Sequence, residues 1–209
     1  MSKAQAKIEN EAEFFGTESI WRILLKISPP VMLSQLVMSM YNIVDSLFVG
    51  KYSSAGLTAL SVIYPLQLII TALAVGTGVG VNTYMSRMYA KGDVKKANAT
   101  AGTGTMLAVI MWAVFAAISA GIMRPYINAM ANAPEAIEYA YQYGMVVCVG
   151  SLGTFLEGVW SKVHQSHGNM RVPMIAQLAG AGTNILLDWI FIFGMGALKP
   201  MGVLGAAIA

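Results

Sequence analysis

The sequence IWRILLKISPPVMLSQLVMSMYNIVDSLFVG, residues 20–50, decides the fold, because it is an apolar run of membrane-spanning length that contains one acid. Residues 27–44 carry no charge, and 18 uncharged residues in a row match a helix that crosses a hydrocarbon layer about 30 Å thick. Pro29 and Pro30 predict a kink in this helix. Because an acid inside a membrane is costly unless it is paired, hydrated or protonated, Asp45 is a candidate functional residue.

The composition places the whole chain in the same class. Hydrophobic residues make up 56% of the sequence and charged residues only 11%, whereas globular domains carry about 25% charged residues. We therefore expect an all-α integral membrane protein whose main partner is the lipid bilayer. The net charge of +3 does not indicate nucleic-acid binding, because the basic residues form short clusters between apolar runs, which is typical of membrane topology.

The later apolar runs predict four more full spans and the beginning of a sixth. Residues 134–164 open with a proline, which is favoured in the first turn of a helix. The last run, residues 203–209, is too short to cross a bilayer. We expect a cytoplasmic arm at residues 1–19 and one transmembrane bundle at residues 20–209, with helices at 20–50, 57–86, 97–123, 134–164 and 171–194 and the start of a sixth at 202–209.

The basic residues predict the orientation of the chain. With a cytoplasmic N-terminus, ten lie inside and three outside, which is the bias that bacterial and other membrane proteins show. The inner set is Lys3, Lys7, Arg22, Lys26, Arg87, Lys91, Lys95, Lys96, Lys162 and Arg171, and the outer set is Lys51, Arg124 and Lys199.

A second intramembrane acid, Asp188, lies at the same expected depth as Asp45. It is six residues from Gly194, as Asp45 is five from Gly50, so both acids lie about 8 to 9 Å below the outer ends of their helices. Each acid heads a polar strip: Asn184 lies one turn below Asp188, and Tyr41 and Asn42 lie about one turn below Asp45. If the strips face each other, the five residues can form one buried polar cluster.

Such a cluster can exchange a cation with the outside. Burial and a like charge nearby both disfavour two ionised carboxylates, so the pair can share a proton. The same carboxylate and amide oxygens can instead hold a small hard cation. A third interpretation is an acid pair that is fixed by hydrogen bonds and has no turnover.

Several segments resemble the multidrug and toxic compound extrusion (MATE) transporters, and most of all their DinF-like prokaryotic branch. The resemblance covers nearly the whole chain in the right order. Its residues are Pro29–Gln35, Tyr41–Asp45, Val49–Gly50, Gly76–Gly80, Ser86–Arg87, Gly92–Asp93, Gly168–Asn169, Pro173, Asn184–Asp188 and Gly202–Ala207.

This resemblance implies a cation-coupled antiporter rather than an enzyme, built from two six-helix lobes in a prokaryotic cytoplasmic membrane. Such proteins export organic cations and other lipophilic drugs, with H⁺ or Na⁺ as the coupling ion and no further cofactor. It places the coupling-ion site on Asp45, Asn184 and Asp188, and the hinge on Pro30. The chain has about half the family's usual length, so we expect an N-terminal lobe whose partner is the C-terminal lobe of the same transporter.

Three alternatives remain open at this point. A lipid-linked oligosaccharide flippase of the same superfamily should have a strongly cationic cavity, whereas the intramembrane charges here are acids. An intramembrane aspartyl protease also uses two aspartates, but Leu186 and Leu187 precede Asp188 where that class has a glycine-containing motif. The chain could also be a half that packs against a partner and does not transport.

Other motifs receive structural interpretations. Gly76, Gly78 and Gly80 follow a membrane helix and not a strand, so they indicate close helix packing rather than a dinucleotide loop. His164 and His167 lack the supporting ligands of a metal site, and no metal is expected beyond Na⁺ at the acid cluster. Glu157 lies near the inner end of its helix, where we expect it to reach the membrane surface or to pair with Lys162.

Overall fold

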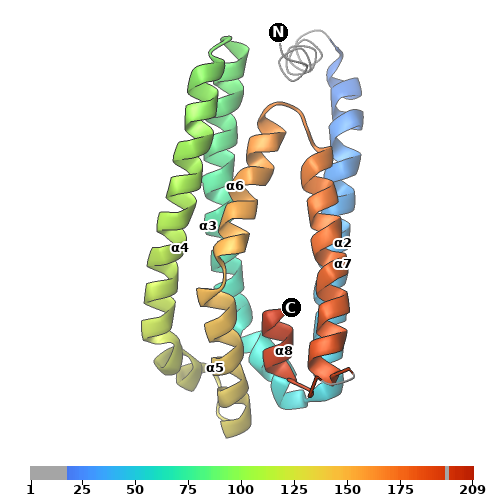
Figure 1. The fold of residues 1–209 in the computed structure, drawn as a ribbon, viewed down its shortest axis with the longest axis vertical. Coiled ribbons are helices and arrows are strands. Elements are labelled where there is room, and N and C mark those ends of the chain that lie inside the picture. Colours follow the sequence, from blue (N-terminus) through green and yellow to red (C-terminus); the bar gives the residue numbers. More distant parts are fainter. Residues whose placement is uncertain (1–17, 196–197) are drawn as a thin grey trace.

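The computed structural model describes residues 18–195 and 198–209, and in this part of the chain all regular structure is helical. The arm expected at residues 1–19 lies outside the described residues, except for Glu18 and Ser19. The helices, labelled in Figure 1, are α2 (Ile20–Tyr52), α3 (Ser54–Ala90), α4 (Val94–Met130), α5 (Pro134–Val149), α6 (Leu152–Ser166), α7 (Arg171–Phe193) and α8 (Val203–Ile208).

The helices form one elongated bundle with two sides. On one side α3 packs against α4, α5 and α6, and on the other α2 packs mainly against α7 (Figure 1). Helix α8 lies at the lower end of the bundle, where it contacts α5, α7 and α2. Large, fully buried side chains fill the interior, among them Ile63, Met85, Met123, Phe155 and Ile192.

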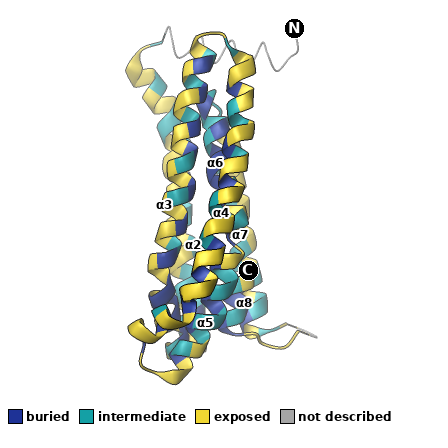
Figure 2. Cartoon of the chain, turned by 90° about the vertical axis from the view of Figure 1, so that its left-hand side faces the viewer, coloured by how far each residue is buried: buried dark blue, intermediate teal, exposed yellow. Residues whose placement is uncertain are grey.

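The outer surface is apolar over most of its length. The face that α3 and α4 present in Figure 2 is largely exposed, and many of its residues are large and hydrophobic. By length and composition, α2, α3, α4 and α7 can each cross a membrane, and α5 and α6 together would make a fifth span. A helical bundle that turns its hydrophobic side chains outward suits a lipid environment, so the expected all-α membrane fold is confirmed.

The range 134–164, which we expected to form one continuous helix, is instead divided into α5 and α6, which are bent by 42°. The break falls at Gly150 and Ser151. The Ser151 hydroxyl donates to the backbone oxygen of Cys148 at 2.8 Å, and the Trp112 indole donates to that of Val149 at 2.9 Å. These two side chains replace the helical hydrogen bonds that the break removes, so the bend leaves both carbonyl groups satisfied.

Helices α3 and α4 begin earlier and end later than their apolar runs suggest, and polar N-caps rather than hydropathy set where they begin. The Ser53 hydroxyl accepts from the backbone N–H of Gly56, and the Asp93 carboxylate accepts from that of Lys96 at 3.0 Å. Hydrogen bonds from the Lys96 side chain and backbone hold the pKa of Asp93 below its usual range. Both helices therefore begin three residues before the starts expected at 57 and 97.

Two glycines bring α3 and α6 into close contact. A Cβ atom on Gly78 would lie 2.5 Å from the backbone oxygen of Gly158, and a Cβ atom on Gly158 would lie 2.9 Å from the Cβ of Ala74. Gly76 and Gly80 face open space instead. The glycine-rich stretch thus acts in helix packing through Gly78, which agrees with its structural interpretation.

Gly202, at the end of the segment between α7 and α8, sets the position at which α8 begins. Gly202 has a φ of +57°, which favours glycine, and its backbone N–H donates to Ile192 O at 3.3 Å. A side chain at this position would collide with the ring of Tyr52 at the end of α2. This residue therefore holds α8 against the ends of both α2 and α7.

Candidate functional site

The two intramembrane acids come together at the contact between α2 and α7. Asp45 is partly buried and Asp188 is 0% exposed, and their carboxylates interact electrostatically. About one turn closer to the ends of these helices, the rings of Phe48 and Phe193 meet edge to face with centroids 6.0 Å apart. This aromatic contact fixes the two helices beside each other at the level of the acids.

The acids and Asn184 present oxygen atoms that lack hydrogen-bond donors. Four buried oxygens have no donor among the described residues: Oδ1 of Asp45, Oδ1 of Asn184, and both Oδ1 and Oδ2 of Asp188. Leaving a buried acceptor unpaired costs about 1–3 kcal/mol, and more when it is charged. A proton or a hard cation removes this cost, because carboxylate and amide oxygens are the ligands that such cations prefer.

Two aromatic hydroxyls complete the polar surroundings. Tyr41 on α2 and Tyr143 on α5 both interact electrostatically with Asp45 and Asp188. Tyr143 is only 4% exposed, and its hydroxyl accepts a hydrogen bond from Nε2 of Gln67 on α3 at 3.2 Å. The cluster therefore receives side chains from α2, α3, α5 and α7.

Sequence reasoning did not single out Tyr143 or Gln67. The available signals were weak: Gln67 is the one carboxamide between Ser54 and Val81, and Tyr143 follows Tyr139 by one helical turn. Neither pattern shows which helices pack against α2 and α7, so neither residue could be assigned to the cluster from the sequence.

The other predicted site residues lie apart from the buried oxygens. Asn42 is exposed, and its Nδ2 donates to the backbone oxygen of Met38 at 2.8 Å, so it lies at the margin of the cluster. Pro30 is fifteen residues before Asp45, about 22 Å along the helix axis, and α2 continues through it. The Ser34 hydroxyl donates to the backbone oxygen of Pro30 at 2.9 Å.

The secondary motifs also have defined positions. Glu157 does not form the expected ion pair with Lys162 in the described structure, because its Oε1 accepts from Ser161 and from Gln177 instead. The rings of His164 and His167 pack edge to face, with centroids 5.8 Å apart. Within the residues that the structure describes, no group of three or more His, Cys, Asp or Glu side chains is arranged to hold a metal.

Known proteins share both this sequence and this fold. The chain is 27% identical over 190 residues to the FAD transporter of Shewanella oneidensis, covering 91% of this chain and 42% of that protein. It is 26% identical over 187 residues to the probable multidrug resistance protein NorM of Thermotoga maritima, covering 89% of this chain and 40% of that protein.

Solved structures agree with these sequence matches. A MATE transporter in its bent conformation superposes on the whole chain with a TM-score of 0.84 at 25% identity, covering 44% of that protein. A MOP superfamily transporter from Pyrococcus furiosus gives a TM-score of 0.83 at 28% identity, covering 89% of this chain and 40% of that protein. The chain thus spans less than half the length of the relatives that it matches.

The expected N-terminal lobe is confirmed by these partial alignments and by the family match. The family model described as MatE matches residues 30–190, which is most of the chain. The chain therefore belongs to the MatE family, whose members are membrane transporters and not enzymes.

Proposed function

We propose that this chain is the N-terminal lobe of a cation-coupled exporter, and that the coupling cation, H⁺ or Na⁺, binds between Asp45, Asn184 and Asp188. The observation that carries the proposal is the set of four buried oxygens without donors at the α2–α7 contact. Two carboxylates and an amide in this arrangement need a positive charge or a proton to be stable together. The lobe then works with a second lobe of the same transporter, in a cytoplasmic membrane with its N-terminus inside.

Cation binding changes the force between α2 and α7. When both acids are ionised, their mutual repulsion favours separation of the two helices, and a bound cation or proton removes that repulsion. Helix α2 can respond because its main contact is with α7, so a change in the force between the two acids acts directly on its packing. A ligand that binds one arrangement more tightly shifts the population toward it, which couples the cation to the shape of the lobe.

The bend that follows is expected near Pro30. Neither Pro29 nor Pro30 has a backbone N–H, so two helical hydrogen bonds are missing in this part of α2. A helix bends most easily where its hydrogen-bond ladder is interrupted. Pro30 therefore acts as the hinge in this mechanism.

Organic cations and lipophilic drugs are the proposed substrates, because relatives are named multidrug resistance or multidrug export proteins. Another relative is named a FAD transporter, so the cation site by itself does not define the substrate. A flippase for lipid-linked sugars is less well supported, since the buried charges of this lobe are acids.

Transport by the complete protein in proteoliposomes tests this proposal. A lipophilic organic cation and FAD are offered as substrates under an imposed H⁺ or Na⁺ gradient. Gradient-driven export should be lost in Asp45→Asn and in Asp188→Asn, and it should persist in Glu138→Gln, a control acid that pairs with Arg124 at the surface. Full export by both aspartate variants would disprove the coupling role of the cluster.

A further inference from the structure

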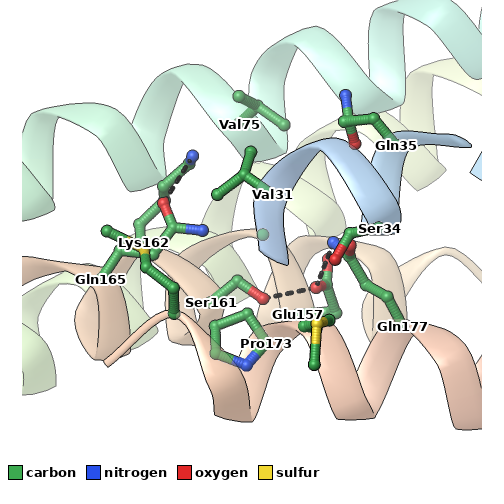
Figure 3. A pocket seen from close by; sticks show the side chains of 13 residues that line it. Val31, Ser34, Gln35, Val75, Glu157, Ser161, Lys162, Gln165, Pro173 and Gln177 are labelled. Carbon is green, nitrogen blue, oxygen red and sulfur yellow. Dashed lines mark hydrogen bonds between the residues drawn. The ribbon is translucent and has the colours of Figure 1, made fainter. Parts of the chain in front are cut away.

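A second polar site lies in the other half of the lobe, between α2, α6 and α7. It is a cavity of about 160 Å³ whose polar lining includes Ser34, Gln35, Glu157, Ser161, Lys162 and Gln177 (Figure 3). We call it the Glu157 pocket. Ser34 precedes Asp45 by eleven residues on α2, and Gln177 precedes Asp188 by eleven on α7. Along both helices, the pocket is therefore about 16 Å from the acid cluster.

Glu157 is a further acid within the helical bundle, on α6. Asp45 lies on α2 and Asp188 on α7, whereas Glu135 and Glu138 lie in the first two turns of α5. The Glu157 Oε1 accepts hydrogen bonds from the Ser161 hydroxyl and from Nε2 of Gln177, the latter at 3.3 Å (Figure 3). Glu157 is exposed, and side chains of α6 and α7 hold its carboxylate at the edge of the cavity. An accessible carboxylate that is fixed in this way can exchange a small cation with water.

The occupant of the pocket must be small. Sites for drug-sized ligands usually measure about 300–1,000 Å³, and this cavity is well below that range. The side-chain oxygens that could bind a cation there belong to the Glu157 carboxylate, the hydroxyls of Ser34 and Ser161, and the carboxamides of Gln35, Gln165 and Gln177. Carboxylate, hydroxyl and amide oxygens suit a hard monovalent cation, and the carboxylate alone suits a proton.

Lys162 keeps this pocket from holding a cation tightly. The titratable residues of the lining are Glu157 and Lys162, both from α6, while α2, α3 and α7 contribute none. The Lys162 ammonium donates to Oε1 of Gln165 at 2.9 Å and does not neutralise Glu157 by direct pairing. A fixed positive charge beside the carboxylate weakens cation binding, which favours rapid exchange over retention.

We propose that the Glu157 pocket is the inner exchange site for a small monovalent cation, where the coupling ion leaves the lobe toward the cytoplasm. This inference rests on the proposed function, because it takes the Asp45–Asp188 cluster as the source of the ion. For H⁺, a proton given up at the cluster protonates the Glu157 carboxylate and is then released to cytoplasmic water, which returns the carboxylate. For Na⁺, the ion passes through the same oxygen set without covalent change.

Ion release by the complete protein in proteoliposomes tests the proposal. The protein is oriented with its N-terminal side toward the lumen, which contains a pH-sensitive or a Na⁺-sensitive dye. After a jump in the external concentration of either ion, Glu157→Gln should release it into the lumen at least tenfold more slowly than wild type. The equilibrium affinity of the Asp45–Asp188 cluster for the cation should stay within twofold of wild type. A release rate within twofold of wild type would overturn the proposal.

Matched variants separate the charge of Glu157 from its structural contacts. Glutamine keeps an oxygen that accepts from Ser161 and Gln177, so Glu157→Gln should unfold at the wild-type temperature. Glu157→Asp keeps the charge and should release ions near the wild-type rate, whereas equal slowing in both variants would show that the carboxylate charge is not responsible. Lys162→Met should slow release by strengthening retention, and Lys162→Arg should not.

The acid-cluster variants distinguish the failure of this inference from that of the proposed function. If Asp45→Asn abolishes coupled exchange while Glu157→Gln leaves release unchanged, the inner exchange site is refuted and the coupling site stands. If Asp45→Asn and Asp188→Asn both keep coupled exchange, the proposed function fails, and with it the assigned source of the ion. The dye that responds identifies the ion as H⁺ or Na⁺.

Discussion

Replacing Asp188 by asparagine should stabilise the lobe, although it removes a proposed coupling residue. Asp188 is 0% exposed, and neither of its carboxylate oxygens has a donor in the described structure. Asparagine has nearly the same shape and replaces one acceptor oxygen with an NH₂ donor. That donor faces a site where the Oδ1 atoms of Asp45 and Asn184 also lack partners.

The size of the effect follows from the cost of unpaired buried groups. Removing one unpaired acceptor and forming one hydrogen bond should raise the free energy of unfolding by about 1–3 kcal/mol. For a chain of 209 residues, each kcal/mol shifts Tm by about 2–4 °C, and the shift per kcal/mol is smaller in a longer protein. The complete protein should therefore unfold at a higher temperature when it carries Asp188→Asn, by up to a few degrees.

Thermal unfolding of the complete protein in detergent, without added Na⁺, measures this change. Asp93→Asn is the matched control: Asp93 is an exposed helix cap that asparagine can replace, and its only loss is the exposed ion pair with Lys96, so its Tm should not rise. A lower Tm for Asp188→Asn would refute the reasoning, because it would mean that the carboxylate already has stabilising partners.

Four further outcomes follow from the structure. Tyr143→Phe should weaken cation binding about fivefold, equivalent to about 1 kcal/mol, as measured by equilibrium titration; unchanged affinity would remove Tyr143 from the cluster. Trp112→Phe should lower the free energy of unfolding by about 1 kcal/mol, because the carbonyl at the α5–α6 break loses its donor; an unchanged Tm would contradict this. Gly158→Ala should destabilise the bundle by about 1–3 kcal/mol, whereas Gly153→Ala, which faces open space on the same helix, should be neutral or stabilising; similar effects in a Tm assay would argue against close α3–α6 packing. Pro30→Ala should slow transport and leave equilibrium cation binding intact, and normal export rates would exclude the hinge.

The helices could be predicted from the sequence because uncharged runs of spanning length have few other structural solutions. Their ends could not, since caps such as Ser53 and Asp93 lie outside the apolar runs. The break between α5 and α6 was also missed. Gly150 and Ser151 mark it in the sequence, but the indole that satisfies the freed carbonyl comes from Trp112, a residue on another helix.

The candidate site was predictable only in part, for a geometric reason. Equal depth along two helices indicated that Asp45 and Asp188 could meet, and the structure places them within electrostatic reach. Depth does not determine the direction in which a helix faces. Tyr41 and Asn42 are both about one turn from Asp45, yet Tyr41 interacts with both acids and Asn42 is exposed.

Equilibrium cation binding tests the central claim most directly. Purified complete protein is titrated with Na⁺, or with acid while proton uptake is recorded, and wild type is compared with an Asp45→Asn, Asp188→Asn double variant. We predict that the double variant binds one cation fewer per protein molecule than wild type and keeps a folded, helical structure. An unchanged number of bound cations would show that the coupling ion does not bind at this cluster.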